Sequence, residues 1–151
     1  MSLKSNMPKW LFLSTMKHFT DNIAGLHVFA EGTERNTKSQ SSWAEIRIDG
    51  PDISEISKDT YRVEAEINIL VATHIDPSNP MLSAQNVGKV TANFIDYDLY
   101  EYTDGDAKIG CFKLTPLANI GDKLDITNMG QIDPNLDLLQ TTIVGNYRII
   151  I

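Results

Sequence analysis

Cysteine, basic clusters and long apolar runs are all scarce in this chain of 151 residues. The one cysteine, Cys111, has no second thiol with which to form an internal disulfide, which favours a reducing compartment such as a cytoplasm. No stretch approaches the roughly 18 consecutive apolar residues of a membrane-spanning helix. The apolar run at residues 10–13 is also short for a secretion signal. The sequence therefore predicts neither membrane insertion nor secretion.

Positive charge is scarce as well. Lys and Arg number 13 against 20 Asp and Glu, which gives a net charge of -7, and no basic run is longer than an isolated pair. Tight binding of nucleic acid needs a cluster of cations that neutralises phosphates, so this class of function is disfavoured. A mildly acidic protein does suit a channel wall along which DNA slides without sticking. Ordinary solubility charge is the alternative explanation.

The motifs of nucleophilic and nucleotide-dependent catalysis are absent. The sequence has neither a G-x-S-x-G elbow nor a G-x-x-x-x-G-K-[ST] phosphate loop. No two of its histidines form an H-x-x-x-H pair: His18, His27 and His74. Residues 133–137 resemble the start of a calcium loop, but Leu138 and Val144 stand where glycine and glutamate are needed. We therefore expect no enzymatic activity, and no catalytic, cofactor-binding or metal-binding residues.

Hydrophobic periodicity predicts two amphipathic helices. The first spans residues 7–24, with Pro8 in its first turn, Gly25 as its stop and an apolar stripe formed by Phe12, Met16, Phe19 and Ile23. The second follows a turn at residues 76–80, has Ser83 as its N-cap and carries a stripe formed by Leu82, Val87, Val90 and Phe94. We expect both helices to pack on one face of a sheet.

Alternation of apolar and polar residues predicts the strands of that sheet. In residues 61–71 every second side chain is apolar, so we expect this strand to face the core under the first helix with Val63, Ala65, Ile67 and Ile69. Further strands are expected at residues 26–30, 43–50, 97–102, 107–114 and 138–151. The predicted fold class is α+β, an antiparallel-dominated β-sheet with two amphipathic helices on one face, in a single domain of residues 1–151.

Two residues of the strand at 43–50 are candidates for a protein interface. Trp43 and Arg47 share the face opposite the apolar one, and a tryptophan beside an arginine on an outer face is typical of an interface anchor. The alternative is that another part of the same chain covers Trp43. The side chains of Glu64 and Glu66 share the polar face of the strand at 61–71, where two solvated carboxylates are commoner than an acid/base pair.

Two polar segments are further candidates for contacts between subunits. Residues 31–42 contain no apolar side chain, and the connection at residues 51–60 is long for a tight hairpin. We expect both segments to order against neighbouring subunits. The candidate interface residues of the first segment are its two cations, Arg35 and Lys38.

In the order of these segments and in their patterns of apolar and polar residues, the chain resembles the tail-terminator and tail-completion proteins of long-tailed bacteriophages. The likeness covers most of the chain: the N-terminal helix, the polar loop, WAEIRIDGP (43–51), YRVEAEINILV (61–71), NVGKVTANF (86–94) and TTIVGNYRIII (141–151). The resemblance implies a structural virion protein that forms a ring, usually a hexamer, which caps the tail tube, ends its growth and joins it to the head. It carries no catalytic motif, so it assigns no site residue.

The resemblance also implies partners and a location. The expected partners are further copies of the chain, a tail-tube protein and a head-completion or connector protein, with DNA passing through the channel without specific binding. The expected location is the neck of the virion, after assembly in the bacterial cytoplasm. Glu64 and Glu66 are candidates for side chains that face the lumen. The alternatives are another neck or tube ring protein, such as a head-closure or tail-tube subunit, and a small-molecule-binding or enzymatic domain with an unrecognised site.

Overall fold

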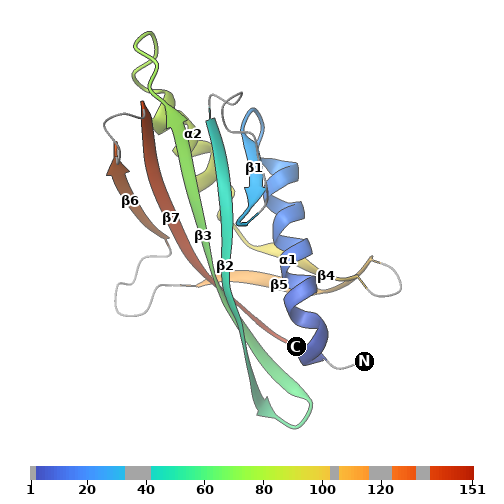
Figure 1. The fold of residues 1–151 in the computed structure, drawn as a ribbon. Coiled ribbons are helices and arrows are strands. Elements are labelled where there is room, and N and C mark those ends of the chain that lie inside the picture. The colour runs from blue at the N-terminus through green and yellow to red at the C-terminus, as the bar shows by residue number, and fades with distance from the viewer. Residues whose placement is uncertain (1–2, 33–41, 103–105, 116–123, 132–136) are drawn as a thin grey trace.

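The computed structural model describes residues 3–32, 42–102, 106–115, 124–131 and 137–151 (Figure 1). Within them the elements follow in the order α1 (Leu3–Asn22), β1 (His27–Ala30), β2 (Ser42–Ser57), β3 (Thr60–His74), α2 (Leu82–Thr91), β4 (Tyr97–Tyr102), β5 (Asp106–Thr115), β6 (Leu124–Gly130) and β7 (Leu138–Ile150). The α+β class predicted from the sequence is confirmed. Strand β6 was not predicted.

The strands follow the path β1-β2-β3-β7-β5-β4, and β6 also pairs with β7. Strand β1 lies parallel to β2, whereas the other pairs are antiparallel. The sheet is therefore mixed and strongly curled, which corrects the expected antiparallel-dominated layer. Alternation of apolar and polar residues marks a strand but not its direction, so the parallel pair had no signal in the sequence.

The sheet curls where β5 leaves β7. Strand β5 pairs with β7 only through residues 113–115, while its earlier part pairs with β4 and runs crosswise to the long strands (Figure 1). Gly145 of β7 lies at this junction, and a Cβ there would approach three core side chains: Phe94 Cδ1 at 2.9 Å, Leu114 Cδ1 at 3.0 Å and Leu124 Cδ2 at 3.1 Å. The absent side chain thus leaves room for core residues from three other segments.

The inward face of β3 forms the centre of the core, as predicted. Val63, Ala65, Ile67 and Ile69 are buried, and they belong to one hydrophobic cluster with side chains from both helices. Both helices therefore lie on the same side of the sheet. The cluster also takes in aromatic side chains from four other segments: Phe94, Tyr97, Phe112 and Tyr147.

The buried stripe of helix α1 agrees only in part with the predicted one: Phe19 and Ile23 are buried and Met16 packs against the core, but Phe12 does not. Its buried residues are Met7, Trp10, Leu11, Ser14, Thr15 and Phe19. Phe12 is 45% exposed and was wrongly placed in the core. The reason is that small polar side chains take inward positions by bonding to β4: Ser14 Oγ accepts a 3.0 Å hydrogen bond from the Tyr100 N–H, and Thr15 Oγ1 lies 2.7 Å from the Tyr97 hydroxyl.

The helix boundaries also differ from the predictions. Helix α1 begins at Leu3 and ends at Asn22, so Pro8 lies inside it instead of in the first turn. In α2 the predicted N-cap Ser83 is wrong, because Met81 holds that position and makes no side-chain capping bond. Asn86 is buried in α2, although its polarity excluded it from the predicted stripe.

Strands β2 and β3 continue beyond the rest of the sheet as a hairpin (Figure 1). Strand β7 pairs with β3 as far as Arg62, and Tyr61 exchanges backbone hydrogen bonds with Ile151, so the hairpin projects from Glu55 onward. We call residues 55–60 the arm. The expected connection at residues 51–60 is wrong in form, because β2 runs to Ser57 and only Lys58 and Asp59 lie between the strands. Its polar character reflects exposure on both faces near the tip, where no other described helix or strand covers it.

Candidate assembly surfaces

The outer face of the sheet, opposite the helices, carries an acidic cluster. Glu64 and Glu66 lie on this face of β3, as the alternation predicted, and are partly exposed. In the register of β2 with β3, Asp52 is the partner of Glu64 and Asp49 is the partner of Glu66. These four carboxylates line an open depression of about 560 Å³. We call them the acidic face.

A bulge in β2 places both aspartates in this cluster. The register shifts between Asp49 and Asp52, at a position where Gly50 adopts a φ of 122°. A Cβ on Gly50 would lie 3.1 Å from the Glu64 carbonyl oxygen, so both the backbone conformation and the close strand favour glycine. Alternation along the strand predicted Glu64 and Glu66 on one face but gave no position for the aspartates. The Asp-Gly-Pro-Asp run was the available signal for a bulge.

Three arginines, Arg47, Arg62 and Arg148, border the acidic face. Arg62 Nε lies 3.1 Å from Glu64 Oε1, and Arg148 of β7 is the cross-strand partner of Glu64 on the other side. Both members of the Arg62–Glu64 pair are more than 40% exposed, so this contact contributes little to stability. Arg47 Nε lies 3.2 Å from Asp49 Oδ1, so four carboxylates face three guanidinium groups and the surface is net negative by one formal charge. A phosphate backbone close to it would meet weak repulsion.

The predicted interface pair, Trp43 and Arg47, separates in the structure. Trp43 does point to the outer face, but it is only 6% exposed, because Ala72 and Leu138 cover it and Phe29 packs against the cluster. Its expected role as an exposed anchor is therefore wrong, and the alternative of cover by the same chain holds. The sequence could not show this because the three covering residues come from three other strands.

Arg47 is exposed and tied to local carboxylates. Its Nε lies 3.2 Å from Asp49 Oδ1 and 3.5 Å from Glu31 Oε2. Such surface pairs orient a side chain without contributing much stability. The other two candidate interface residues, Arg35 and Lys38, lie outside the residues that the structure describes.

Strand β6 forms an outer edge of the sheet and exposes apolar side chains. It pairs with β7 on one side, and Ile126 and Met129 are 49% and 41% exposed. An edge strand with exposed apolar residues can pair with another chain. Strand β6 was not predicted from the sequence because only its first four residues, 124–127, alternate between apolar and polar.

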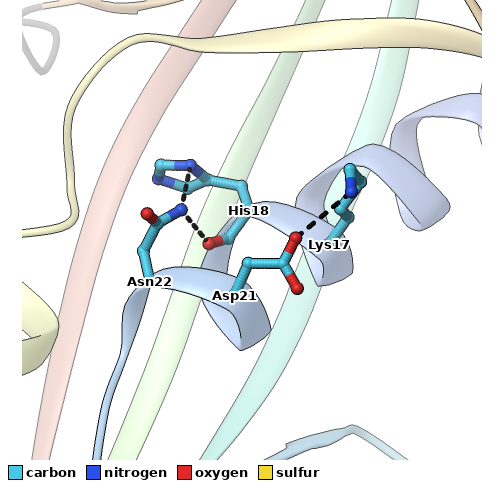
Figure 2. A network of polar contacts seen from close by, with 4 residues as sticks. All are labelled: Lys17, His18, Asp21 and Asn22. Carbon is cyan, nitrogen blue, oxygen red and sulfur yellow. Dashed lines mark hydrogen bonds and ion pairs between the residues drawn. The ribbon is translucent and has the colours of Figure 1, made fainter.

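A second depression, of about 340 Å³, lies between α1 and the start of β4 and is lined by His18, Lys17 and Tyr97 among others. Figure 2 shows the polar contacts on its helical wall. Asn22 Nδ2 donates to the His18 carbonyl at 2.6 Å and lies 3.4 Å from His18 Nδ1. Lys17 Nζ donates to Asp21 Oδ2 at 3.2 Å. This hydrogen bond, with the charge of the carboxylate, raises the pKa of Lys17.

His18 has a structural role in this depression. Its Nε2 lies 2.8 Å from the Asn93 carbonyl oxygen, so Nε2 carries the proton, and Nδ1 accepts from the amide of Asn22. The ring also stacks on Tyr97, with centroids 4.6 Å apart and planes 10° apart. With both nitrogens engaged, His18 joins α1 to the end of α2 and to β4 and is poorly placed for proton transfer to a ligand.

The described residues contain no group of three or more His, Cys, Asp or Glu side chains that could hold a metal ion. Neither of the two helices in that part of the chain is long and apolar enough to cross a membrane. Comparison of the sequence with protein-family models finds no matching family, and comparison with curated proteins finds no match.

Proposed function

We propose that the protein is a structural subunit that assembles into a ring, of the tail-terminator type that caps a tail tube and joins it to the neck of a virion. The observation that carries the proposal is the division of the sheet into an inner face, covered by both helices, and an outer acidic face that neither α1 nor α2 covers. In this proposal the outer face lines the channel, and the exposed edges form the contacts between subunits.

The exposed apolar side chains support the part of the proposal that concerns assembly. Ile126 and Met129 lie on the edge strand β6, and Ile56 and Ile150 lie on the arm and at the end of β7, where they are 48% and 58% exposed. Two different apolar regions on one subunit suit a heterologous contact, which closes into a ring when the rotation between copies divides a full turn.

The acidic face supports the part of the proposal that concerns DNA. A wall that repels phosphates weakly keeps DNA mobile, whereas a wall of lysine and arginine would hold it through counterion release. Glu64 and Glu66, with Asp49 and Asp52, supply such a wall when this face lines the channel. The proposal assigns no catalytic residue and no cofactor, and its partners are further copies of the chain, a tube protein and a connector protein.

The test is the mass of the purified protein in solution, with and without a tube protein. Light scattering over a wide concentration range should reveal a closed oligomer, and electron microscopy should show rings with a central hole. A monomer at every concentration, alone and with the tube protein, would contradict the proposal. A ring whose lumen is lined mainly by Lys and Arg would contradict the electrostatic part alone.

The second candidate is another ring of the same neck or tail, a head-closure protein or a tube subunit. The arm favours it, because a protruding hairpin suits a subunit that contacts the layer above or below. Electron microscopy separates the two. A terminator forms single closed rings, whereas a tube subunit polymerises into stacked rings once its concentration or an initiator permits.

A further inference from the structure

A groove on the molecule lies where β5 diverges from β7. It has a volume of about 630 Å³ and is lined by Cys111, Lys113, Leu114, Arg148, Ile149 and Ile150 among others. The pairing of β5 with β7 stops at Lys113 and Arg148. The last two residues of β7 therefore have no strand partner on the groove side among the described residues, and the groove ends in a short free strand edge.

The groove combines positive charge with apolar surface. Lys113 and Arg148 are its charged lining residues, and no carboxylate lines it. Within the described part of the chain neither cation has a carboxylate within ion-pair distance, in contrast to Lys17 and Lys108, which pair with Asp21 and Asp98. Arg148 is also the cross-strand neighbour of Glu64, but among the described residues it has no ion-pair partner. Two such cations beside the exposed Ile150 suit a ligand that brings both carboxylates and an apolar side chain.

The arm has that composition. It carries two exposed carboxylates, Glu55 and Asp59, against one exposed ammonium group, Lys58, so its formal charge is -1 (two negative less one positive). Ile56 is 48% exposed near its tip. The arm cannot fill the groove of its own chain, because β3 and β5 lie on opposite sides of β7.

We infer that the arm of one copy docks into the β5–β7 groove of the next copy. In this contact Ile56 packs against Leu114 and Ile150 of the neighbour, and the acidic side chains of the arm face Lys113 and Arg148. The contact joins two different surfaces, so it repeats in one direction around a ring. The inference rests on the proposed function and specifies which surfaces make the subunit contact.

Cys111 provides a direct test, because it lines the groove and is the one cysteine in the chain. An Ile56→Cys variant places a second thiol on the arm. Mild oxidation should convert it into a ladder of disulfide-linked oligomers on a non-reducing gel, and a reductant should collapse the ladder to monomer. The matched control is Met81→Cys, since Met81 is 63% exposed but lies at the start of α2. This control, and Ile56→Cys combined with Cys111→Ser, should give no ladder.

Charge reversal tests the same contact through the mass of the oligomers in solution. A groove variant, Lys113→Glu with Arg148→Glu, and an arm variant, Glu55→Lys with Asp59→Lys, should each weaken self-association at least about tenfold. A mixture of the two should restore it, because each arm then meets a groove of opposite charge. Circular dichroism of each variant checks that it is folded, and the cross-linking test does not depend on these variants.

The outcomes distinguish the contact from the ring. A ladder from Ile56→Cys together with restoration in the mixture supports the inference. Oligomers in light scattering without any ladder, or charge variants that assemble as well as the wild type, would overturn the arm-in-groove contact and leave the proposed ring standing. A monomer under all conditions would overturn both.

Discussion

Asn86 Nδ2 donates a 2.8 Å hydrogen bond to Ser42 Oγ, which joins the middle of α2 to the first residue of β2. The same amide nitrogen lies 3.1 Å from Thr73 Oγ1 on β3. All three side chains are buried. This polar contact fixes α2 against two strands at a point where apolar packing alone would allow the helix to slide.

Replacing Asn86 with Ala should therefore destabilise the domain. The change leaves two buried hydroxyl groups, of Ser42 and Thr73, without their amide partner, which costs about 1–3 kcal/mol. Urea unfolding followed by circular dichroism measures the loss. Lys89→Ala, on the exposed side of the same helix, is the control and should change the free energy of unfolding by less than about 0.5 kcal/mol.

Gly145→Ala should lower the free energy of unfolding more than the same change at Gly110 or at Gly88. Its new methyl group would meet the Phe94 ring and two leucine side chains at once, for a cost of about 1–3 kcal/mol. At Gly110 the close atom within 3 Å is the Cδ1 end of Ile149, which can rotate away. At Gly88 of α2 nothing lies within 4 Å, so alanine should stabilise by about 0.5–1 kcal/mol. Equal melting temperatures for the three variants would contradict the packing at the β5–β7 junction.

Two buried tyrosines should make the protein sensitive to alkaline pH. Burial raises the pKa of Tyr97 and of Tyr147 above the ordinary value of 10.0. A raised folded-state pKa means that the stability from the neutral hydroxyl is fully present below pH 10 and is lost as the pH rises toward the folded value. Unfolding at high pH, followed by absorbance at 295 nm, should show tyrosine ionisation that coincides with loss of the fold. In Tyr97→Phe the absorbance change that coincides with unfolding should become smaller. An unchanged absorbance step in this variant would mean that Tyr97 is accessible to solvent in the folded protein.

Ile67→Asp should prevent folding. Ile67 is 0% exposed at the centre of β3, and an unpaired carboxylate there costs several kcal/mol out of a typical total of about 5–15 kcal/mol. Asn68→Asp, one residue further on the outer face, introduces the same group and should leave a cooperative thermal transition. A soluble Ile67→Asp protein that melts cooperatively would refute the placement of this strand face.

Reversing the charge of the acidic face should create affinity for DNA. At low salt the wild-type protein should not retard duplex DNA on a native gel. Glu64→Lys combined with Glu66→Lys should do so, with a retardation that disappears as salt rises. Glu101→Lys with Asp137→Lys makes the same change in net charge at exposed positions outside the acidic face and serves as the control. Equal retardation by both double variants would mean that net charge, and not this surface, governs the interaction.

The sequence predicted those helices and strands in which one face is buried in the core along the whole element. The strand at 61–71 has one face on the core throughout, so its alternation also predicted the burial of Ile67 correctly. For helix α1 the prediction held for Phe19 and Ile23 but not for Phe12, because Ser14 and Thr15 occupy inward positions through hydrogen bonds to residues more than eighty positions away. A stripe defined by apolar residues alone cannot include them, and Phe12 was taken in their place.

The candidate surfaces were predictable to a smaller extent. Glu64 and Glu66 share a face because they lie two residues apart on one strand, which any regular strand guarantees. Their aspartate neighbours and the cover over Trp43 depend on register between strands, which a single sequence does not specify. The arm was taken for a loop because a strand with both faces in solvent has no core to impose alternation.

Strand β7 has a consequence for how the chain folds. It pairs with β3, β5 and β6, and among the described strands it alone links the β1-β2-β3 part of the sheet to β5 and β4. Its partner in β3 is about seventy positions earlier in the sequence, as in the pair of Ile69 with Ile143. Folding therefore has to close a long loop before the core is complete, which slows it relative to a helical protein of this size. Until β7 docks, β3 and β5 each present a bare strand edge. The period before docking is when the chain is most prone to aggregate, and it is the step at which a chaperone would have the largest effect on yield.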